Sequence, residues 1–302
     1  MSSGADSPSD TRSGFIALAG RPNVGKSTLA NSIVGAKIAI VSDKPQTTRR
    51  AIRGVATGPD WQLVLVDLPG IQRPRDALTE RMQRRVESEL AEADGCLLVL
   101  NAQQGVGPGD RFIAGLLAAA PVPVVIAVNK IDRSDRAKTA SVLQAADELG
   151  IGDEIFPVSA RTGAGVRSLT DHLAALLPAG PFYFERRQLS DQSEGVILSE
   201  LVREQVLART REEVPHAVEV EIEDIDRHRE EFVRIEAVIL VETESQKGIL
   251  IGARGSMIKS MGTAARRELE RELAQHVHLD LSVRVRRSWR GDEALLDRLG
   301  IT

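Results

Sequence analysis

The sequence predicts two domains: a doubly wound α/β domain with a phosphate loop and, after it, a smaller α+β domain. Three observations predict this arrangement. Short apolar runs alternate with helix-length segments over the first half of the chain, and a glycine-rich loop follows the first run. After Gly180 the apolar residues recur instead with the period of two that half-buried strands show. With 302 residues the chain is long enough for two domains of ordinary size.

The strands of the first domain are predicted from runs that are almost continuously apolar, as in strands covered on both faces of a mostly parallel sheet. These runs are 15–19, 63–66, 96–100, 124–128 and 155–158. Helix-length segments separate them, such as 26–33, 76–93 and 138–149. A further strand at 52–56 is expected at the edge, paired as a hairpin with 63–66.

Proline and glycine residues from Pro178 to Pro181 interrupt the pattern, and we place the domain boundary there. The first domain is expected over 14–180, and a linker with the second domain over 181–302. Residues 1–13 are rich in Ser, Asp and Gly and are expected to be a disordered tail. The second domain is predicted in the order α-β-β-α-β with a short terminal helix, its strands at 218–222, 233–241 and 277–285.

The composition is that of a globular protein, with 42% apolar and 27% charged residues. The net charge of -4 gives no global sign of a nucleic-acid partner. Cys96, the single cysteine, cannot form an internal disulfide, which favours a reducing compartment. No apolar run approaches the roughly 20 residues that span a bilayer, so a cytoplasmic protein is expected unless it lies on a membrane surface.

The strongest motif is a phosphate loop, G-x-x-x-x-G-K-[ST], placed between a predicted strand and a predicted helix as the motif requires. Lys26 is expected to reach the β- and γ-phosphates, and the Ser27 hydroxyl to ligate Mg²⁺. Backbone N–H groups and the helix N-terminus would bind the phosphates. A glycine turn with a chance lysine is the alternative, and the flanking elements argue against it. The residues predicted to bind nucleotide here are Gly20, Arg21, Pro22, Asn23, Val24, Gly25, Lys26, Ser27 and Thr28.

Guanine rather than adenine is predicted from the sequence Asn-Lys-Ile-Asp at the end of a buried strand. Asp132 can accept hydrogen bonds from guanine N1–H and the 2-amino group, and adenine would leave this carboxylate unpaired. Asn129 can bond the N7 edge and brace the phosphate loop, while Lys130 packs along the base. Ser159 and Ala160, after the next strand, can supply a backbone N–H to guanine O6.

Two polar segments, 46–50 and 67–70, predict a switch that responds to the γ-phosphate. Asp67 ends a strand and is placed to hold Mg²⁺ through water, while the N–H of Gly70 is expected to sense the γ-phosphate. Thr48 is favoured over Thr47 as the residue that completes the Mg²⁺ shell. Both segments are expected to be ordered by GTP and released on hydrolysis.

Slow intrinsic hydrolysis is expected because the position after Gly70 cannot orient water. Many GTPases place a glutamine there, and this chain has Ile71 instead. Gln72 stands one place further on, so a shift by one residue is a weaker alternative. The attacking water would then be positioned by backbone groups, or by a residue or ion that the sequence does not identify.

The second domain carries a G-x-x-G loop formed by Gly252, Ala253, Arg254 and Gly255, between a short helical turn and a long helix. In an α-β-β-α-β unit this loop is typical of a KH domain, where it clamps about four nucleotides of single-stranded RNA. Glycine is needed where phosphates approach closer than a Cβ would permit. Arg254 would be the main phosphate contact.

Charge distribution supports RNA binding by this domain, because basic residues are concentrated after an acidic segment at 212–244. The basic residues of 266–272 are explained without RNA, because Arg and Glu can pair there on a solvated helix face. This alternative explains less well why Lys259 and the cluster 284–290, which includes Arg287, are basic. Bases would enter an apolar groove that includes Ile251 and Ile258. The basic residues are Lys247, Arg254, Lys259, Arg266, Arg267, Arg271, Arg284, Arg286, Arg287, Arg290 and Arg298.

Together these motifs resemble the Era family of bacterial GTPases. The matching segments include 20–27, 46–49, 67–71, 129–132 and 158–160, and the resemblance continues through 246–255 and 285–290. It implies a ribosome-assembly GTPase whose KH domain binds single-stranded rRNA at the 3′ end of the small-subunit RNA, with a loose membrane association. No obligate oligomer is expected.

The resemblance also makes K⁺ stimulation a hypothesis. Asn23 matches a loop asparagine that helps to hold K⁺ in relatives without the glutamine. Two positions depart from the family pattern: Leu68 replaces a usual threonine, and Ala253 replaces a frequent lysine, so one RNA phosphate contact is in doubt.

The sequence leaves two alternative functions. The first is a GTPase that acts at a membrane or on a protein partner, with a C-terminal domain that does not bind RNA. The second is a GTP-driven tRNA-modification or metabolic enzyme, which would need a second catalytic cluster that the sequence does not offer.

Overall fold

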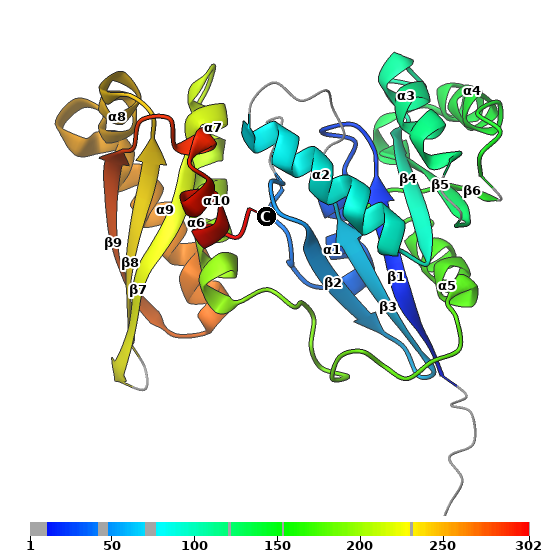
Figure 1. Cartoon of the computed structure of the whole chain (residues 1–302), viewed down its shortest axis with the longest axis horizontal. Coiled ribbons are helices and arrows are strands. Elements are labelled where there is room, and N and C mark those ends of the chain that lie inside the picture. The colour runs from blue at the N-terminus through cyan, green and yellow to red at the C-terminus, as the bar shows by residue number, and fades with distance from the viewer. Residues whose placement is uncertain are drawn as a thin grey trace, which may run out of the picture. The chain divides into compact units, whose positions relative to one another are not determined.

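The computed structural model describes residues 11–41, 48–69, 77–119, 122–152, 154–229 and 232–301. It forms two compact units (Figure 1); among the described residues the second unit comprises 192–301 together with 40–41 and 77–81, and the first unit comprises the rest. Each unit has its own sheet and its own apolar core, which confirms the predicted combination of an α/β and an α+β fold.

The first unit is built on a six-stranded sheet in the order β2-β3-β1-β4-β5-β6. Neighbouring strands are parallel except β2 and β3, which form the expected antiparallel hairpin at the edge. The carboxyl ends of β1, β4 and β5 therefore lie at one edge of the sheet, where doubly wound folds bind ligands. The strands are β1 (Arg12–Ala19), β2 (Ile52–Thr57), β3 (Trp61–Asp67), β4 (Gly95–Asn101), β5 (Val124–Asn129) and β6 (Glu154–Pro157).

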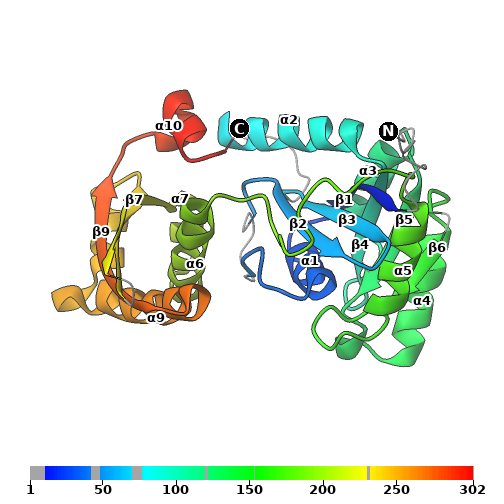
Figure 2. The same cartoon turned by 90° about the horizontal axis from the view of Figure 1, so that it is seen from below.

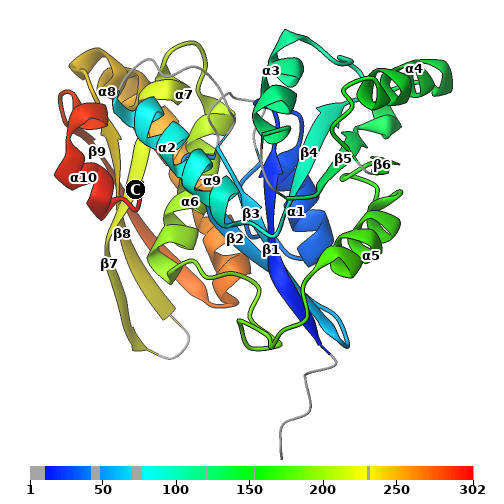
Figure 3. The same ribbon diagram turned by 45° about the vertical axis from the view of Figure 1, so that its right-hand side comes forward.

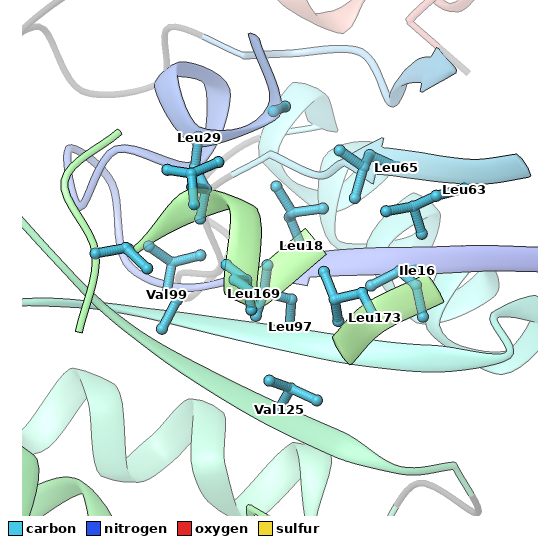
Figure 4. Packing of buried hydrophobic residues seen from close by; sticks show 14 of the residues in the cluster. Ile16, Leu18, Leu29, Leu63, Leu65, Leu97, Val99, Val125, Leu169 and Leu173 are labelled. Carbon is cyan, nitrogen blue, oxygen red and sulfur yellow. The ribbon is translucent and has the colours of Figure 1, made fainter. Parts of the chain in front are cut away.

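Helices cover both faces of this sheet, which explains why its strands are apolar without alternation. Leu29 of α1 and Leu169 and Leu173 of α5 pack on the face that presents Leu18 (Figure 4). The other face packs against α2, α3 and α4 (Figure 2). The helices are α1 (Lys26–Val34), α2 (Ala77–Glu92), α3 (Pro108–Leu117), η1 (Ile131–Arg133), α4 (Arg136–Asp147) and α5 (Val166–Leu176).

The first strand begins earlier than its apolar run suggests, so the expectation of a tail as far as Ser13 is wrong for its last residues. Ser13 is 2% exposed, and its hydroxyl donates to the carbonyl of Pro181 at 2.5 Å. Thr11 donates to the carbonyl of Gly180 at 2.9 Å. These polar side chains bond to the returning chain, a long-range contact that no local pattern reveals.

The segment after Gly180 also belongs to the first unit, so the domain boundary moves to Asp191. Gln62 exchanges two hydrogen bonds with the backbone of Phe184, both of 2.9 Å. The N–H of Val55 donates to the carbonyl of Leu189 at 2.9 Å. The expected linker therefore binds along the edge strand β2, where unpaired backbone groups are available.

The second unit has a three-stranded sheet in the order β7-β8-β9, in which β7 and β8 are antiparallel and β8 and β9 parallel. The predicted α-β-β-α-β order is confirmed, with a short helix α7 in addition. Its elements are α6 (Glu194–Arg209), α7 (Val214–Ala217), β7 (Glu219–Arg229), β8 (Phe232–Val241), α8 (Glu244–Ile251), η2 (Ala253–Gly255), α9 (Ser256–Leu273), β9 (His276–Val285), η3 (Trp289–Gly291) and α10 (Glu293–Arg298).

The long helices α6 and α9 pack on one face of this sheet (Figure 3). Val206 of α6 and Leu269 of α9 are fully buried against Val233 and Ile235 of β8. Packing of a single apolar face explains the clean alternation of β8 and β9 in the sequence. Among the described residues, no helix is both long and apolar enough to cross a membrane.

One buried ion cluster lies in this core. Arg203 of α6 is 0% exposed and donates to both carboxylate oxygens of Glu200, at 3.1 and 2.7 Å. Its Nε also lies 3.7 Å from a carboxylate oxygen of Glu219, which is equally buried. Two carboxylates around one guanidinium keep the buried charges compensated.

Candidate functional site

The phosphate loop follows β1 and opens α1, as predicted. Asn23 and Gly25 adopt positive φ angles of 63° and 103°. A Cβ at Gly25 would collide with Nδ2 of Asn129, so only glycine fits where the loop passes this side chain. Positive φ values at Asn23 and Gly25 turn the backbone tightly just before the N-terminus of α1, the geometry that loops binding phosphate use.

Lys26 lies beneath the loop, only 7% exposed. Its Nζ donates to the carbonyls of Gly20 and Arg21 at 3.1 and 3.3 Å. Burial lowers the pKa of Lys26, and the charge of Asp67 opposes this shift. The ammonium is therefore held within reach of the space that the loop encloses.

Three oxygen-bearing side chains meet next to Lys26. The Ser27 hydroxyl donates to Asp67 Oδ2 at 2.6 Å, and the Thr48 hydroxyl does so at 3.3 Å. The two hydroxyl oxygens are 3.1 Å apart. Asp67 is fully buried, burial raises its pKa, and its Oδ1 has no hydrogen-bond partner among the described residues. Hard oxygen ligands with a buried carboxylate oxygen left over fit Mg²⁺.

The amide of Asn129 joins the phosphate loop to the predicted base site. Its Nδ2 donates to the carbonyl of Val24 at 3.1 Å, and its Oδ1 accepts from the N–H groups of Lys130 and Ala160 at 2.7 and 3.0 Å. Lys130 adopts a φ of 67° and its Nζ donates to the carbonyl of Asn23 at 2.6 Å. Burial lowers the pKa of Lys130.

Asp132 lies beside Ser159, as the order of the motifs suggests. The Ser159 hydroxyl donates to Asp132 Oδ1 at 2.7 Å, and this bond is the largest cause that lowers the pKa of Asp132. The structure adds Arg161, whose guanidinium lies 2.5 Å from Oδ2. Sequence reasoning missed Arg161, although its place directly after Ser159-Ala160 was a usable signal.

Some predicted residues of this site add little or cannot be placed. Thr28 lies on α1, half-buried, and Pro22 is half-buried within the loop. Gly70 lies outside the described residues, as do Thr47 and the two positions after Gly70 on which the hydrolysis argument rests.

The predicted RNA loop joins α8 to α9. Gly252 has φ 70° and ψ 174°, and Arg254 and Gly255 have φ values of 51° and 75°. A Cβ at Gly252 would lie 2.7 Å from the Cβ of Met257, closer than real Cβ atoms come. The loop backbone is therefore tightly bent and free of side chains at both glycines, with Ala253 and Arg254 exposed between them.

An open groove of about 420 Å³ runs between α9 and the edge strand β9. Its apolar lining includes Ile258, as expected, but not Ile251, which is half-buried on α8. Lys259 and Arg266 add positive charge on the helix side. The full lining is Ile258, Lys259, Gly262, Thr263, Arg266, Leu279, Asp280 and Leu281.

The basic cluster at 284–290 is mostly paired, which corrects the interpretation drawn from its charge. Arg284 lies 2.7 Å from Glu223, Arg286 2.6 Å from Asp292, and Arg290 3.3 Å from Glu242. Arg284 on β9 and Glu223 on β7 flank β8 in one sheet, whereas Glu242 and Asp292 lie outside the strands. The basic residues of this region without a partner among the described residues are Lys247, Arg254, Lys259, Arg267 and Arg287.

Comparison with known proteins finds a match for each of the two units. A family model described as "50S ribosome-binding GTPase" matches residues 15–130, and one described as "KH domain" matches residues 213–290. The protein named GTPase Era from Mycobacterium avium (strain 104) is 45% identical over 295 residues, which are 96% of this chain and 98% of the relative. GTPase Era from Mycobacterium tuberculosis (strain H37Rv) is 45% identical over 294 residues, or 95% and 98%.

Two solved structures share the whole architecture. A variant of Aquifex aeolicus Era bound to GDP·AlF4⁻ superposes with a TM-score of 0.91 at 34% identity, covering 97% of this chain and 100% of that one. Era in complex with MgGDPNP and nucleotides 1506–1542 of 16S ribosomal RNA gives a TM-score of 0.91 at 34% identity, covering 97% and 99%. The resemblance seen in the sequence is confirmed, and the chain belongs to the Era family of GTPases.

Proposed function

We propose that this GTPase is a switch that binds single-stranded RNA, in the groove beside the loop from Gly252 to Gly255. The observation that carries the proposal is the combination of two glycines with positive φ, a groove with apolar walls, and Lys259 in that groove, which has no ion-pair partner among the described residues. A single-stranded backbone can approach the glycines, while its bases can lie against Ile258 and Leu281.

At the nucleotide site, GTP and GDP would be held with Mg²⁺. Ser27 and Thr48 would ligate the ion directly and Asp67 through water, since their oxygens already converge. Mg²⁺, when bound, offsets the charge that develops on the phosphates during hydrolysis. Lys26 would contribute its ammonium to the β- and γ-phosphates from beneath the loop.

Guanine selection would come from Asp132, whose lowered pKa keeps it an ionised acceptor. Ser159 fixes the orientation of this carboxylate through one oxygen. The N–H of Ala160 donates to Asn129 Oδ1 at 3.0 Å in this structure and would donate to guanine O6 when the base is bound, beside Asn129 at the N7 edge. The hydrogen bond of Asn129 to Val24 links base recognition to the phosphate loop.

K⁺ stimulation of hydrolysis belongs to the same proposal. Asn23 stands exposed at the top of the loop with φ 63°, and its carbonyl is tied to Lys130. This chain has Ile71 where many GTPases have a catalytic glutamine. A monovalent cation beside Asn23 would instead supply positive charge next to the phosphates. Equal rates of hydrolysis in K⁺ and Na⁺ buffers would contradict this part.

The RNA is proposed to be the 3′ end of the small-subunit rRNA, with a role in assembly of that subunit. Support comes from the relative solved with nucleotides 1506–1542 of 16S rRNA, which shares the fold over almost the whole chain. The groove of this chain has the apolar walls and the cations that such a ligand requires.

The test compares Lys259→Ala with Arg284→Ala in fluorescence anisotropy with a labelled single-stranded RNA over a series of salt concentrations. Lys259 is exposed in the groove and has no ion-pair partner in the part of the chain that the structure describes, whereas Arg284 is an exposed cation that is paired with Glu223. Loss of one phosphate contact should flatten the slope of log K against log salt by about 0.7 for Lys259→Ala. Arg284→Ala should keep the slope of the unsubstituted protein.

Equal slopes for both variants and the unsubstituted protein would overturn the assignment of the groove. In that case binding to anionic vesicles, or to a protein partner, becomes the better account of the second unit. Vesicle binding measured on the same samples separates these outcomes, because the membrane association implied by the family does not require the groove.

A further inference from the structure

The side chain of Arg21, the second residue of the phosphate loop, leaves the loop and reaches the start of α3. Its Nε donates to Asp110 Oδ1 at 2.8 Å, and one terminal nitrogen donates to Gln104 at 3.3 Å. These partners lie far from Arg21 in the sequence and form part of neither the guanine motif nor the Mg²⁺ site.

Asp110 is built into its position. It is 0% exposed, and its second oxygen accepts from the N–H of Gly107 at 2.8 Å, which closes the first turn of α3. A capping bond on one oxygen leaves the other aimed at Arg21. Gly109 completes the fit, because a Cβ there would lie 2.7 Å from Cδ of Arg21.

The loop also makes hydrogen bonds with the guanine motif and, through Ser27, with Asp67 and Thr48 of the Mg²⁺ site. Asn129 holds the carbonyl of Val24, and Lys130 holds that of Asn23. In the described part of the chain, the side chain of Arg21 joins the loop to Gln104, which precedes α3, and to Asp110 in the first turn of α3. The loop is thus fixed from two sides, and one of them depends on a fully buried carboxylate.

We propose that Asp110 is a positioning residue for the phosphate loop, acting through Arg21. The proposal rests on the assignment of loop residues to phosphate binding. Backbone N–H groups that already face the phosphates need no reorganisation when the nucleotide arrives. Without the Arg21 contact, the loop adopts the binding-competent conformation in only a fraction of the molecules. The apparent affinity for the nucleotide falls in proportion to that fraction.

The experiment measures Kd for GDP and for inosine diphosphate with Arg21→Ala, Asp110→Ala and the double variant. Each single variant should raise both Kd values about tenfold, as expected for loss of one charge-assisted hydrogen bond. The double variant should be no weaker than the weaker single one, since both changes remove the same contact. The ratio of the two Kd values should stay constant, because Asp132 recognises the 2-amino group that distinguishes the bases.

The matched control is Asp94→Ala. Asp94 is also an acid that accepts a backbone hydrogen bond, from the N–H of Phe15 in β1 at 2.8 Å. Its removal should lower the melting temperature without changing Kd for GDP, which separates positioning from a general loss of stability. Arg21→Lys should restore part of the affinity, because an ammonium can still approach Asp110.

Kd values of Arg21→Ala and Asp110→Ala that equal that of the unsubstituted protein would overturn the proposal, and so would strictly additive effects. If Asp110→Ala does not fold, Arg21→Ala and Arg21→Lys decide the question alone. Lys26→Ala tests the phosphate site independently of Asp110. Unchanged GDP binding by Lys26→Ala would contradict the phosphate site itself rather than the role of Asp110.

Discussion

Replacing Gly252 by alanine should weaken RNA binding much more than the same replacement of Gly255, although both glycines flank the same loop. Gly252 has φ 70° and ψ 174°, a region that is essentially restricted to glycine. Its Cβ would also lie 2.7 Å from the Cβ and 2.9 Å from the N of Met257, at the start of α9. The loop must therefore move to accept the methyl group.

Gly255 differs in both respects. Its φ of 75° and ψ of 15° are left-handed helical values, which alanine adopts at a cost of about 1 kcal/mol. The nearest atom to its Cβ would be 4.0 Å away, on Ile258. For Gly252, strain and collision together amount to about 2 kcal/mol or more. The affinity for RNA should fall roughly 30-fold for Gly252→Ala and about fivefold for Gly255→Ala.

Fluorescence anisotropy with a labelled single-stranded RNA at fixed salt measures both variants. Circular dichroism and the affinity for GDP serve as controls, since the nucleotide site lies in the other unit and should not respond. RNA binding by Gly252→Ala that equals that of the unsubstituted protein, or that exceeds that of Gly255→Ala, would refute the assignment of this loop to RNA.

Three further predictions concern the other sites. Asn129→Ala loses its bonds to Val24 and Ala160, at about 1 kcal/mol each, so Kd for GDP should rise roughly 30-fold in calorimetry; an unchanged Kd would contradict the bracing role. Arg203→Ala leaves Glu200 and Glu219 as buried charges without their cation. The free energy of unfolding of the second unit, measured in urea, should fall by about 3–5 kcal/mol while GDP binding stays intact. A decrease of less than about 1 kcal/mol would refute this. Because the pKa of Asp67 is raised by burial, its proton is taken up at higher pH than by an exposed carboxyl, so Mg²⁺ affinity should weaken as pH falls toward that raised value. Titration of Mg²⁺ into the GDP complex at several pH values checks this, and Asp67→Asn should remove the dependence.

The elements and the nucleotide motif were predictable because their signals are local. A phosphate loop is defined by consecutive residues, and continuous apolar runs such as 96–100 indicate buried strands. The position of the G-x-x-G loop from Gly252 to Gly255 was predictable for the same reason. These features need no knowledge of which segments meet in space.

The remaining features depend on long-range contacts. The bond of Ser13 to Pro181 and the pairing of Leu189 with β2 place the chain after Gly180 on the first unit, and no periodicity indicates either. The ion pair of Arg284 with Glu223 requires the arrangement of β7 and β9 around β8. Arg21 and Asp110 are likewise joined only by the packing of α3 next to the phosphate loop.

The central claim is that GTP binding and RNA binding belong to one switch, and RNA affinity in the two nucleotide states tests it most directly. The probe is a labelled single-stranded copy of the 3′ end of the small-subunit rRNA, compared with a scrambled sequence, in the presence of MgGDPNP or MgGDP. We predict tight binding that is selective for the native sequence and stronger with GDPNP. Equal and weak binding of both RNAs in both states would contradict the account.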